Sequence, residues 1–139
     1  FNRIIPGAIL SILQEKELII RSDGTPERDY MYIKDAVHAY LLLAENLSKE
    51  EIIGQAFNFG TENPISVIDL FKKLLSIAGK KIEPKILGQA KNEINRQYLS
   101  IEKVKNLLGW KPEYTLEEGL KETIQWYTEY FNSRLESNF

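Results

Sequence analysis

The sequence contains no cysteine and only one histidine among its 139 residues. The absence of cysteine excludes disulfide bonds and thiolate catalysis. Zinc and other transition metals bind mainly through cysteine and histidine side chains, so no metal site is expected. A chain without cysteine fits the reducing cytoplasm, which is the location that we expect.

Long apolar runs are also missing. No stretch approaches the roughly 20 apolar residues that a helix needs to span a bilayer, and no signal-like segment opens the chain. The chain begins at Phe1 rather than at methionine, so we expect a fragment of a longer protein. Eighteen Lys and Arg residues against 20 Asp and Glu residues give a formal net charge of -2, so neither nucleic acid nor a membrane is an expected partner.

The spacing of the glycines excludes two common nucleotide-binding loops. A Rossmann fingerprint needs glycines two and then three residues apart, and a Walker loop also needs closely spaced glycines. The eight glycines here are all at least six residues apart, at positions 7, 24, 54, 60, 79, 88, 109 and 119. This chain is therefore not expected to hold NAD or ATP by a glycine-rich loop.

What is present is an ordinary globular composition, with 43% hydrophobic and 27% charged residues. The length fits one domain, residues 1–139. Apolar residues at helical spacing predict helices at about residues 6–15, 36–47, 67–78, 100–109 and 116–131. Shorter runs predict strands at 18–21, 28–33, 55–60 and 81–87, the first two able to pair, and a loop at 88–97. Alternating strands and helices indicate an α/β or α+β fold with a small open sheet, and of these we expect α/β.

Several residues carry signals for helix ends. Ser66 with Asp69, and Thr115 with Glu118, match the capping box, in which two residues three apart satisfy each other's free backbone N–H groups. Asp35 is expected to cap the helix that follows it.

Tyr30 and Lys34 match the Tyr-x-x-x-Lys spacing of a catalytic pair in short-chain dehydrogenases. That chemistry needs both side chains on one helical face, where Cβ atoms lie about 5 to 6 Å apart. In the predicted strand they would be about 13 Å apart, so we expect a packing tyrosine, a surface lysine and no catalytic residue in this chain. Trp110 and Trp126 are expected to pack in the interior.

Arg28 stands at the head of the second predicted strand, after a Gly-Thr-Pro loop. Its guanidinium offers a planar fork of N–H donors that suits phosphate oxygens, and Asn2, Arg3 and Arg21 add further polar groups. On spacing alone, a surface ion pair between Arg28 and Asp29 is slightly favoured over anion binding.

The chain resembles the C-terminal part of the extended short-chain dehydrogenase/reductase family in four segments in register: FNRIIPGAI, DGTPERDYMYIKDAVHAYLLLAE, AFNFGTENPISVIDL and LLGWKPEYTLEEGLKETIQWY. This family includes the NAD-dependent nucleotide-sugar epimerases and 4,6-dehydratases. The resemblance runs from Phe1 to about Phe131. The stretches RIIPG, YLLLAE and NEINRQYLSIEKVKNLLGW look most like CDP-glucose 4,6-dehydratase.

The resemblance implies a substrate-binding subdomain that lacks the Rossmann half, which carries NAD and the catalytic residues. No cofactor is expected in this chain, and the chain alone is expected to be inactive. The parent enzyme is implied to be a cytoplasmic lyase or isomerase of carbohydrate biosynthesis, a homodimer or tetramer. In a 4,6-dehydratase, NAD takes hydride from sugar C4, water leaves across C5 and C6, and hydride returns to C6, whereas an epimerase returns it to C4.

The resemblance also suggests roles for individual residues. The family's Arg-Asp-aromatic motif matches Arg28-Asp29-Tyr30, which implies that Arg28 contacts the nucleotide phosphates or ribose. Asn2 and Arg3 occupy the entry to this subdomain and are implied to approach the phosphates.

The nucleobase and the second phosphate have their own candidates. Ile20 and Arg21 lie on the strand that lines the base in similar proteins. Many members carry Arg-Pro-Gly-Asp in a later loop, where this chain reads QAKNE at residues 89–93, so Lys91 or Arg96 is the candidate for a second phosphate contact. The identity of the base stays open.

Three functions remain in view. The leading one is binding of a nucleotide-diphosphate sugar for NAD-dependent 4,6-dehydration. The alternatives are a nucleotide-sugar 4-epimerase and a non-catalytic module whose exposed aromatic residues bind a protein partner.

Overall fold

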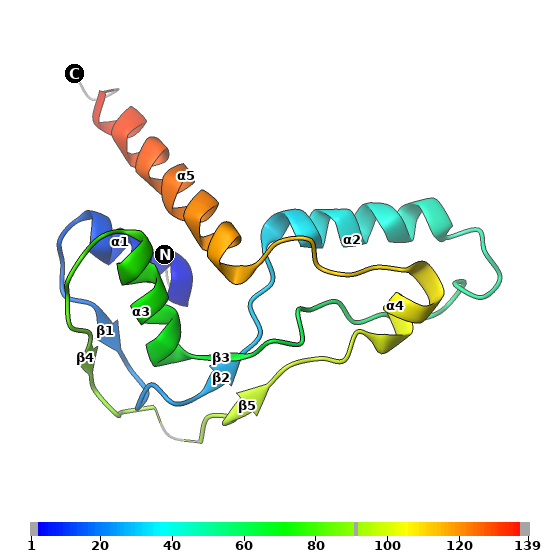
Figure 1. Cartoon of the computed structure of the whole chain (residues 1–139), viewed down its shortest axis with the longest axis horizontal. Helices are drawn as coiled ribbons and strands as arrows, with labels where there is room; N and C mark the ends of the chain where they lie inside the picture. The colour runs from blue at the N-terminus through cyan, green and yellow to red at the C-terminus, as the bar shows by residue number, and fades with distance from the viewer. Residues whose placement is uncertain (1–2, 91, 137–139) are drawn as a thin grey trace.

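The computed structural model describes residues 3–90 and 92–136, with side chains up to residue 133. This part of the chain contains five helices and five very short strands, whose arrangement is drawn in Figure 1. In chain order they are α1 (Ile4–Leu13), β1 (Ile19–Ile20), β2 (Glu27–Arg28), α2 (Ile33–Asn46), β3 (Ile65–Ser66), α3 (Val67–Ile77), β4 (Lys85–Ile86), β5 (Arg96–Gln97), α4 (Glu102–Leu108) and α5 (Leu116–Glu136).

The elements form two bodies (Figure 1). Helices α1, α3 and α5 pack together beside β1 and β4, whereas α2 and α4 extend to the other side. One sheet is the parallel pair β1 and β4, and the other has the order β3-β2-β5, with β2 antiparallel to β3 and parallel to β5. The predicted class, α/β with five helices and a small open arrangement of strands, is confirmed.

Helix α3 forms the centre of the main core. Its apolar face is fully buried at Leu70 and Leu74, which are both 0% exposed, and it contacts α1 and α5. The buried members of this core are Ala8, Ile9, Ile12, Leu18, Ile20, Val67, Leu70, Phe71, Leu74, Leu75 and Leu120. Because β1 supplies Ile20 to the same core, this packing also fixes where β1 lies.

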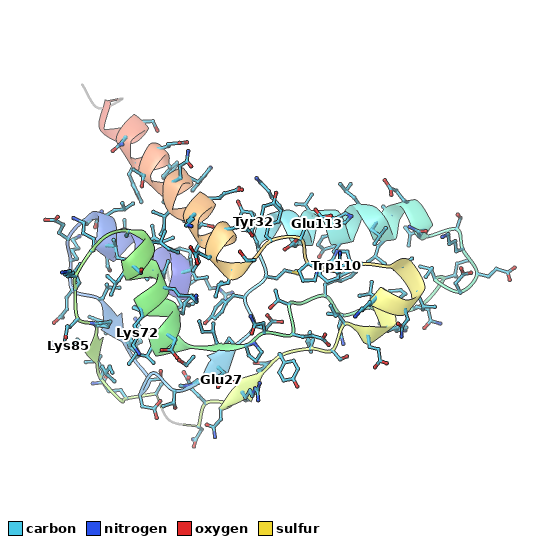
Figure 2. All side chains as sticks on the ribbon, in the orientation of Figure 1. Glu27, Tyr32, Lys72, Lys85, Trp110 and Glu113 are labelled. Atoms are coloured by element: carbon cyan, nitrogen blue, oxygen red, sulfur yellow. The ribbon has the colours of Figure 1, made fainter. Side chains whose placement is uncertain are left out.

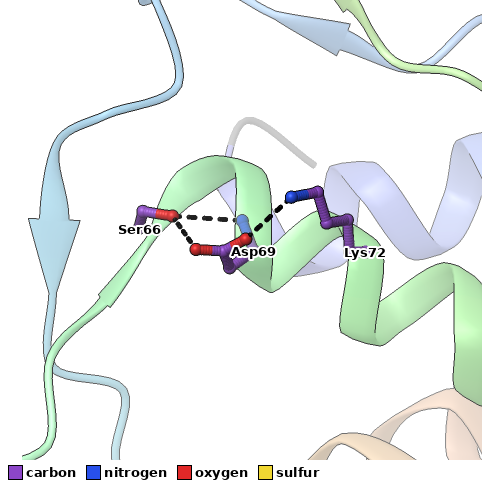
Figure 3. Close-up of polar contacts among 3 residues, drawn as sticks. All are labelled: Ser66, Asp69 and Lys72. Carbon is purple, nitrogen blue, oxygen red and sulfur yellow. Dashed lines mark hydrogen bonds and ion pairs between the residues drawn. The ribbon is translucent and has the colours of Figure 1, made fainter.

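The predicted capping residues begin two helices, but at Ser66 only half of the box forms, because Asp69 accepts from the Ser66 hydroxyl rather than from its backbone N–H. Ser66 Oγ accepts a hydrogen bond from the Asp69 backbone N–H at 3.2 Å and donates one to Asp69 Oδ2 at 2.7 Å (Figure 3). The Ser66 hydrogen bond, followed by that of Lys72, lowers the pKa of the Asp69 carboxyl. Thr115 and Glu118 form the second box, since each accepts from the other's backbone N–H.

A second, smaller core lies between α2 and α4. Trp110 is 1% exposed there, as predicted, and meets Phe59 edge to face with ring centroids 4.9 Å apart (Figure 2). The buried residues of this core are Ala39, Ile101, Val104 and Trp110. Trp126 differs from expectation because it lies on the outer side of α5, where it is 55% exposed and stacks on the ring of Tyr130.

Asp35 does not cap α2, as the sequence had suggested, because it lies within the first turn of that helix. Its buried carboxylate accepts hydrogen bonds from the backbone N–H groups of Glu113 at 2.9 Å and Tyr114 at 3.4 Å. This contact joins the start of α2 to the segment that leads into α5.

The predicted strand at 28–33 is wrong beyond Arg28. The Tyr32 carbonyl accepts from the Ala36 N–H at 3.2 Å, so the chain is already helical from Ile33. Ile33 and Val37 are four residues apart, which is helical spacing. Ile33 belongs to this helical pattern as well as to the run that looked like strand alternation.

Other strand predictions also need correction. Strands β1 and β2 do not pair with each other, since β1 pairs with β4 and β2 with β3 and β5. Within the described part of the chain, residues 55–60 form no strand because no neighbouring strand pairs with them. The predicted strand at 81–87 shortens to β4, and the predicted loop at 88–97 ends in β5.

A polar cluster joins the two bodies where α5 meets α2. Glu122 Oε2 accepts from the Tyr32 hydroxyl at 2.7 Å and lies 2.6 Å from Lys34 Nζ. The hydrogen bond from Lys34, followed by that from Tyr32, lowers the pKa of Glu122. Tyr30 precedes α2 while Lys34 lies on it, so the two do not share a helical face.

We expect Leu74→Ala to lower the free energy of unfolding by about 2–5 kcal/mol, because it leaves a cavity in the main core. Leu107→Ala makes the same chemical change at a side chain that is 44% exposed on α4, and should cost under about 0.5 kcal/mol. Urea unfolding followed by circular dichroism measures both. Equal losses would contradict the assignment of the core.

We expect Glu122→Gln to reduce the pH dependence of stability. A carboxyl whose folded pKa lies below its usual value of 4.5 stabilises the protein above that value, and this contribution is lost as pH falls through the folded pKa. Wild type and variant should therefore differ in unfolding free energy near neutral pH and converge in acid. Glu129→Gln on the same helix is the control, and a constant difference at every pH would contradict the prediction.

Candidate functional site

A cavity of about 480 Å³ opens where the start of α1, strand β1 and the first turns of α3 meet. This volume lies within the usual range of small-molecule sites. The residues that line it are Arg3, Ile4, Gly7, Ala8, Ser11, Glu17, Leu18, Ile19, Ile20, Arg21, Ser22, Val67, Phe71 and Glu93. Three of the predicted substrate-binding residues, Arg3, Ile20 and Arg21, are thus brought together on one cavity.

The cavity has apolar walls and a charged rim. Side chains of the main core, including Ile20 and Phe71, are buried beneath it, whereas Arg3, Arg21 and Glu93 are exposed. Apolar surface can pack against a flat ring, and guanidinium groups attract phosphate oxygens. The arrangement therefore suits a ligand with an apolar ring at one end and an anionic group at the other.

The loop after β4 lies along the end of β1. The backbone N–H groups of Gln89 and Ala90 both donate to the Arg21 carbonyl, at 2.8 and 3.1 Å, and the Gly88 N–H donates to the Ser22 carbonyl at 3.2 Å. These bonds extend the β1–β4 pairing and bring the following loop to the cavity. Glu93 reaches the cavity in this way.

Arg28 lies at the end of β2, between Ile65 on β3 and Gln97 on β5. Its Nη1 group donates to the carbonyls of Glu27 and Ile94, both at 2.7 Å. It forms no ion pair with any described residue, so the alternative of an Arg28–Asp29 pair is not supported. Three of its five N–H donors, on Nε and Nη2, have no partner in the described part of the chain.

Arg28 is not a wall residue of the cavity but adjoins it. Ile94, whose carbonyl it binds, directly follows Glu93 on the rim. Both charges act on Tyr30: burial raises the pKa of its phenol, Arg28 opposes that rise, and Glu93 adds to it. The Arg28 guanidinium is therefore held beside the cavity through the short segment 93–94.

The remaining predicted residues are not brought to the cavity. Arg96 lies on β5, where its Nε is 3.0 Å from Glu27 Oε2 and its guanidinium lies over the Tyr98 ring at 5.4 Å (Glu27 is labelled in Figure 2). Asn2 and Lys91 lie outside the described residues.

Two features of the site were missed in the sequence. Gly7 and Ser11 line the cavity from α1, and they are small residues four apart on one helical face. That spacing is the signal that would have indicated room beside α1. Val67 and Phe71 line it from α3, and their only sequence signal was the helical period of the core.

The described residues contain no group of histidine, cysteine, aspartate or glutamate side chains arranged to hold a metal ion. None of the helices described is long and apolar enough to cross a membrane.

The fold corresponds to the C-terminal part of the extended short-chain dehydrogenases. The sequence profile of the GDP-mannose 4,6 dehydratase family matches residues 1–123. The chain therefore belongs to this family, within the NAD-dependent nucleotide-sugar epimerases and dehydratases.

The relatives include both epimerases and dehydratases. UDP-glucuronate 4-epimerase of Thermodesulfobacterium geofontis is 36% identical over 119 residues, which cover 85% of this chain and 35% of that protein. A trifunctional UDP-glucose 4,6-dehydratase of Arabidopsis thaliana is 35% identical over 130 residues, or 92% of this chain and 19% of that protein. This chain thus spans at most about a third of either relative.

A solved structure shows the same fold. UDP-glucose 4-epimerase from Thermotoga maritima, crystallised with UDP-glucose, superposes with a TM-score of 0.80 at 32% identity. The match covers 93% of this chain and 40% of that one.

Proposed function

We propose that this chain is the substrate-binding part of an NAD-dependent nucleotide-sugar 4,6-dehydratase and that its cavity holds the nucleotide diphosphate. The observation that carries the proposal is the convergence of Arg3, Ile20 and Arg21 on one cavity of about 480 Å³, with Arg28 held beside it. Arg3 directly precedes α1, Ile20 and Arg21 lie at the end of β1, and Arg28 ends β2, so the set comes from segments that are separate in the sequence.

The ligand's two ends would meet different surroundings. The nucleobase packs against Ile20 and its apolar neighbours, while the diphosphate lies toward the arginines. Of the two carboxylates on the cavity, Glu17 is 3.2 Å from Lys85 Nζ, which offsets its charge. Among the described residues, Arg3 and Arg21 form no ion pair with Glu17, Glu93 or any other carboxylate, so both are available for the phosphate oxygens.

The chain's contribution to the reaction is positioning. NAD supplies the redox chemistry when bound, and we propose that it binds to a part of the parent protein outside this chain. Binding energy from the nucleotide, which does not react, can orient the sugar at the reacting centre. The same role suits a 4-epimerase, the second candidate, because both kinds of enzyme occur among the relatives.

The exposed face of α2 supports the presence of an NAD-binding part. Four apolar residues, at spacings of four, three and one, are between 51% and 77% exposed: Ile33, Val37, Tyr40 and Leu41. Exposed apolar stripes of this kind mark interaction surfaces. We propose that the NAD-binding part covers this face. A separate protein partner on α2, with no nucleotide site, is the competing function of an interaction module.

Titration calorimetry of the full-length protein with CDP-, UDP-, dTDP- and GDP-glucose separates these functions. We expect at least one of these nucleotide sugars to bind, because the cavity offers apolar packing and cationic groups together. If none of the four binds, the proposal fails and the interaction module is favoured.

We expect Arg28→Ala to weaken nucleotide binding by roughly 1.5–3 kcal/mol, the contribution of a hydrogen bond to a charged group. Lys103→Ala removes a cation that instead donates to Gln55 and to the Ala56 carbonyl, and it should leave the affinity unchanged. The same calorimetric titration measures both variants. An Arg28→Ala protein with wild-type affinity would remove Arg28 from the site.

A further inference from the structure

We propose that Asp29 is a positioning residue that holds Arg28 in the orientation needed to bind the diphosphate, an inference that rests on the proposed function. Asp29 does not touch the cavity or pair with the arginine. Its carboxylate instead binds the turn at residues 60–62, on a segment distant in sequence.

Three donors converge on the Asp29 carboxylate. Oδ2 accepts from the backbone N–H groups of Thr61 at 2.7 Å and Glu62 at 3.1 Å, and Oδ1 accepts from the Thr61 hydroxyl. Consecutive backbone N–H groups that point to one spot form a natural anion site, which Asp29 fills from within the chain. We call this set of contacts the Asp29 clasp.

The turn is shaped around the carboxylate. A Cβ added at Gly60 would lie 2.7 Å from Asp29 Oδ2, too close for any other residue without movement. Glu62 has a φ of 54°, a left-handed conformation that costs free energy for a residue with a side chain. Its carboxylate accepts from the Ile101 N–H at 3.1 Å, which anchors the turn to the start of α4.

The clasp acts on Arg28 through the backbone. Successive side chains of an extended chain point to opposite sides, so drawing Asp29 toward the turn directs Arg28 the other way. There the guanidinium meets the Ile94 carbonyl, beside the cavity. Because β2 is only two residues long, its ladder gives little restraint at its end. The Asp29 clasp restrains the backbone directly after β2. The turn that it holds leads into β3, whose Ile65 pairs with Arg28.

A double-mutant cycle tests this inference on the full-length protein, with UDP and CDP as probes in titration calorimetry. We expect Asp29→Asn to weaken binding about tenfold, within the loss that a small misplacement of a binding group causes. In an Arg28→Ala background, the same change should have less than about a twofold effect, because the group that Asp29 positions is gone. Wild-type circular dichroism spectra will establish that the variants are folded.

Asp35→Asn is the matched control. Asp35 also accepts from two consecutive backbone N–H groups, but it joins α2 to the segment before α5. Its replacement should lower the unfolding midpoint and leave the affinity of the folded protein within about twofold. If Asp29→Asn fails to fold, Thr61→Val, which removes only the hydroxyl donor, replaces it in the cycle, with an expected loss of about threefold.

The outcomes separate this inference from the proposed function. If Arg28→Ala weakens binding while the clasp variant does not, Asp29 has no positioning role and the nucleotide site stands. If the clasp variant weakens binding equally in both backgrounds, Asp29 acts independently of Arg28 and the inference is overturned. If nucleotide binds but Arg28→Ala leaves its affinity unchanged, the role of Arg28 fails and that of Asp29 fails with it.

Discussion

The packing of α3 between α1 and α5 determines where the other elements of the site lie. Leu70 and Leu74 are completely buried in this contact, and the Ser66 capping box sets the residue at which α3 begins. Strand β1 is held against the same core by Ile20, so the cavity forms where α1, β1 and α3 meet. The cavity is therefore a consequence of core packing, with charged residues added only at its rim. Apolar burial of this kind supplies most of the driving force for folding.

The helices could be predicted because their signals are local. The boxes at Ser66 and Thr115 lie within four residues of sequence, and the apolar period of α3 needs no knowledge of its partners. The strands could not, since a two-residue strand exists only through its pairing. The sequence after Arg28 fitted both strand alternation and helical spacing. Strand pairing ends at Arg28, and the carboxylate of the next residue, Asp29, binds residues 61 and 62. A local sequence pattern cannot reveal this contact between Asp29 and residues 61 and 62.

The sequence indicated candidate residue types for the site but not their geometry, and their role in binding stays a prediction. Arg3, Ile20 and Arg21 were candidates from chemistry and resemblance, and only the fold brings them to one cavity. Arg28 was expected at the head of a strand, and it is instead the last residue of β2. Its interaction with the Ile94 carbonyl spans 66 residues of sequence, so no local signal could indicate it. The same holds for the Asp29 clasp, whose partners are more than 30 residues away.

Two arginines on neighbouring strands show why orientation matters as much as charge. Arg96 faces the Glu27 carboxylate at 3.0 Å, and this pairing offsets its positive charge. Arg28 is held by two neutral carbonyls, which orient the guanidinium without cancelling its charge. Both carboxylates next to Arg28 in sequence are engaged elsewhere, Glu27 by Arg96 and Asp29 by three donors of the 61–62 turn. A half-buried cation kept without a counter-ion costs stability, and an anionic ligand would recover that cost on binding. The uncompensated charge is thus the physical reason for which we propose a diphosphate beside Arg28 rather than beside Arg96.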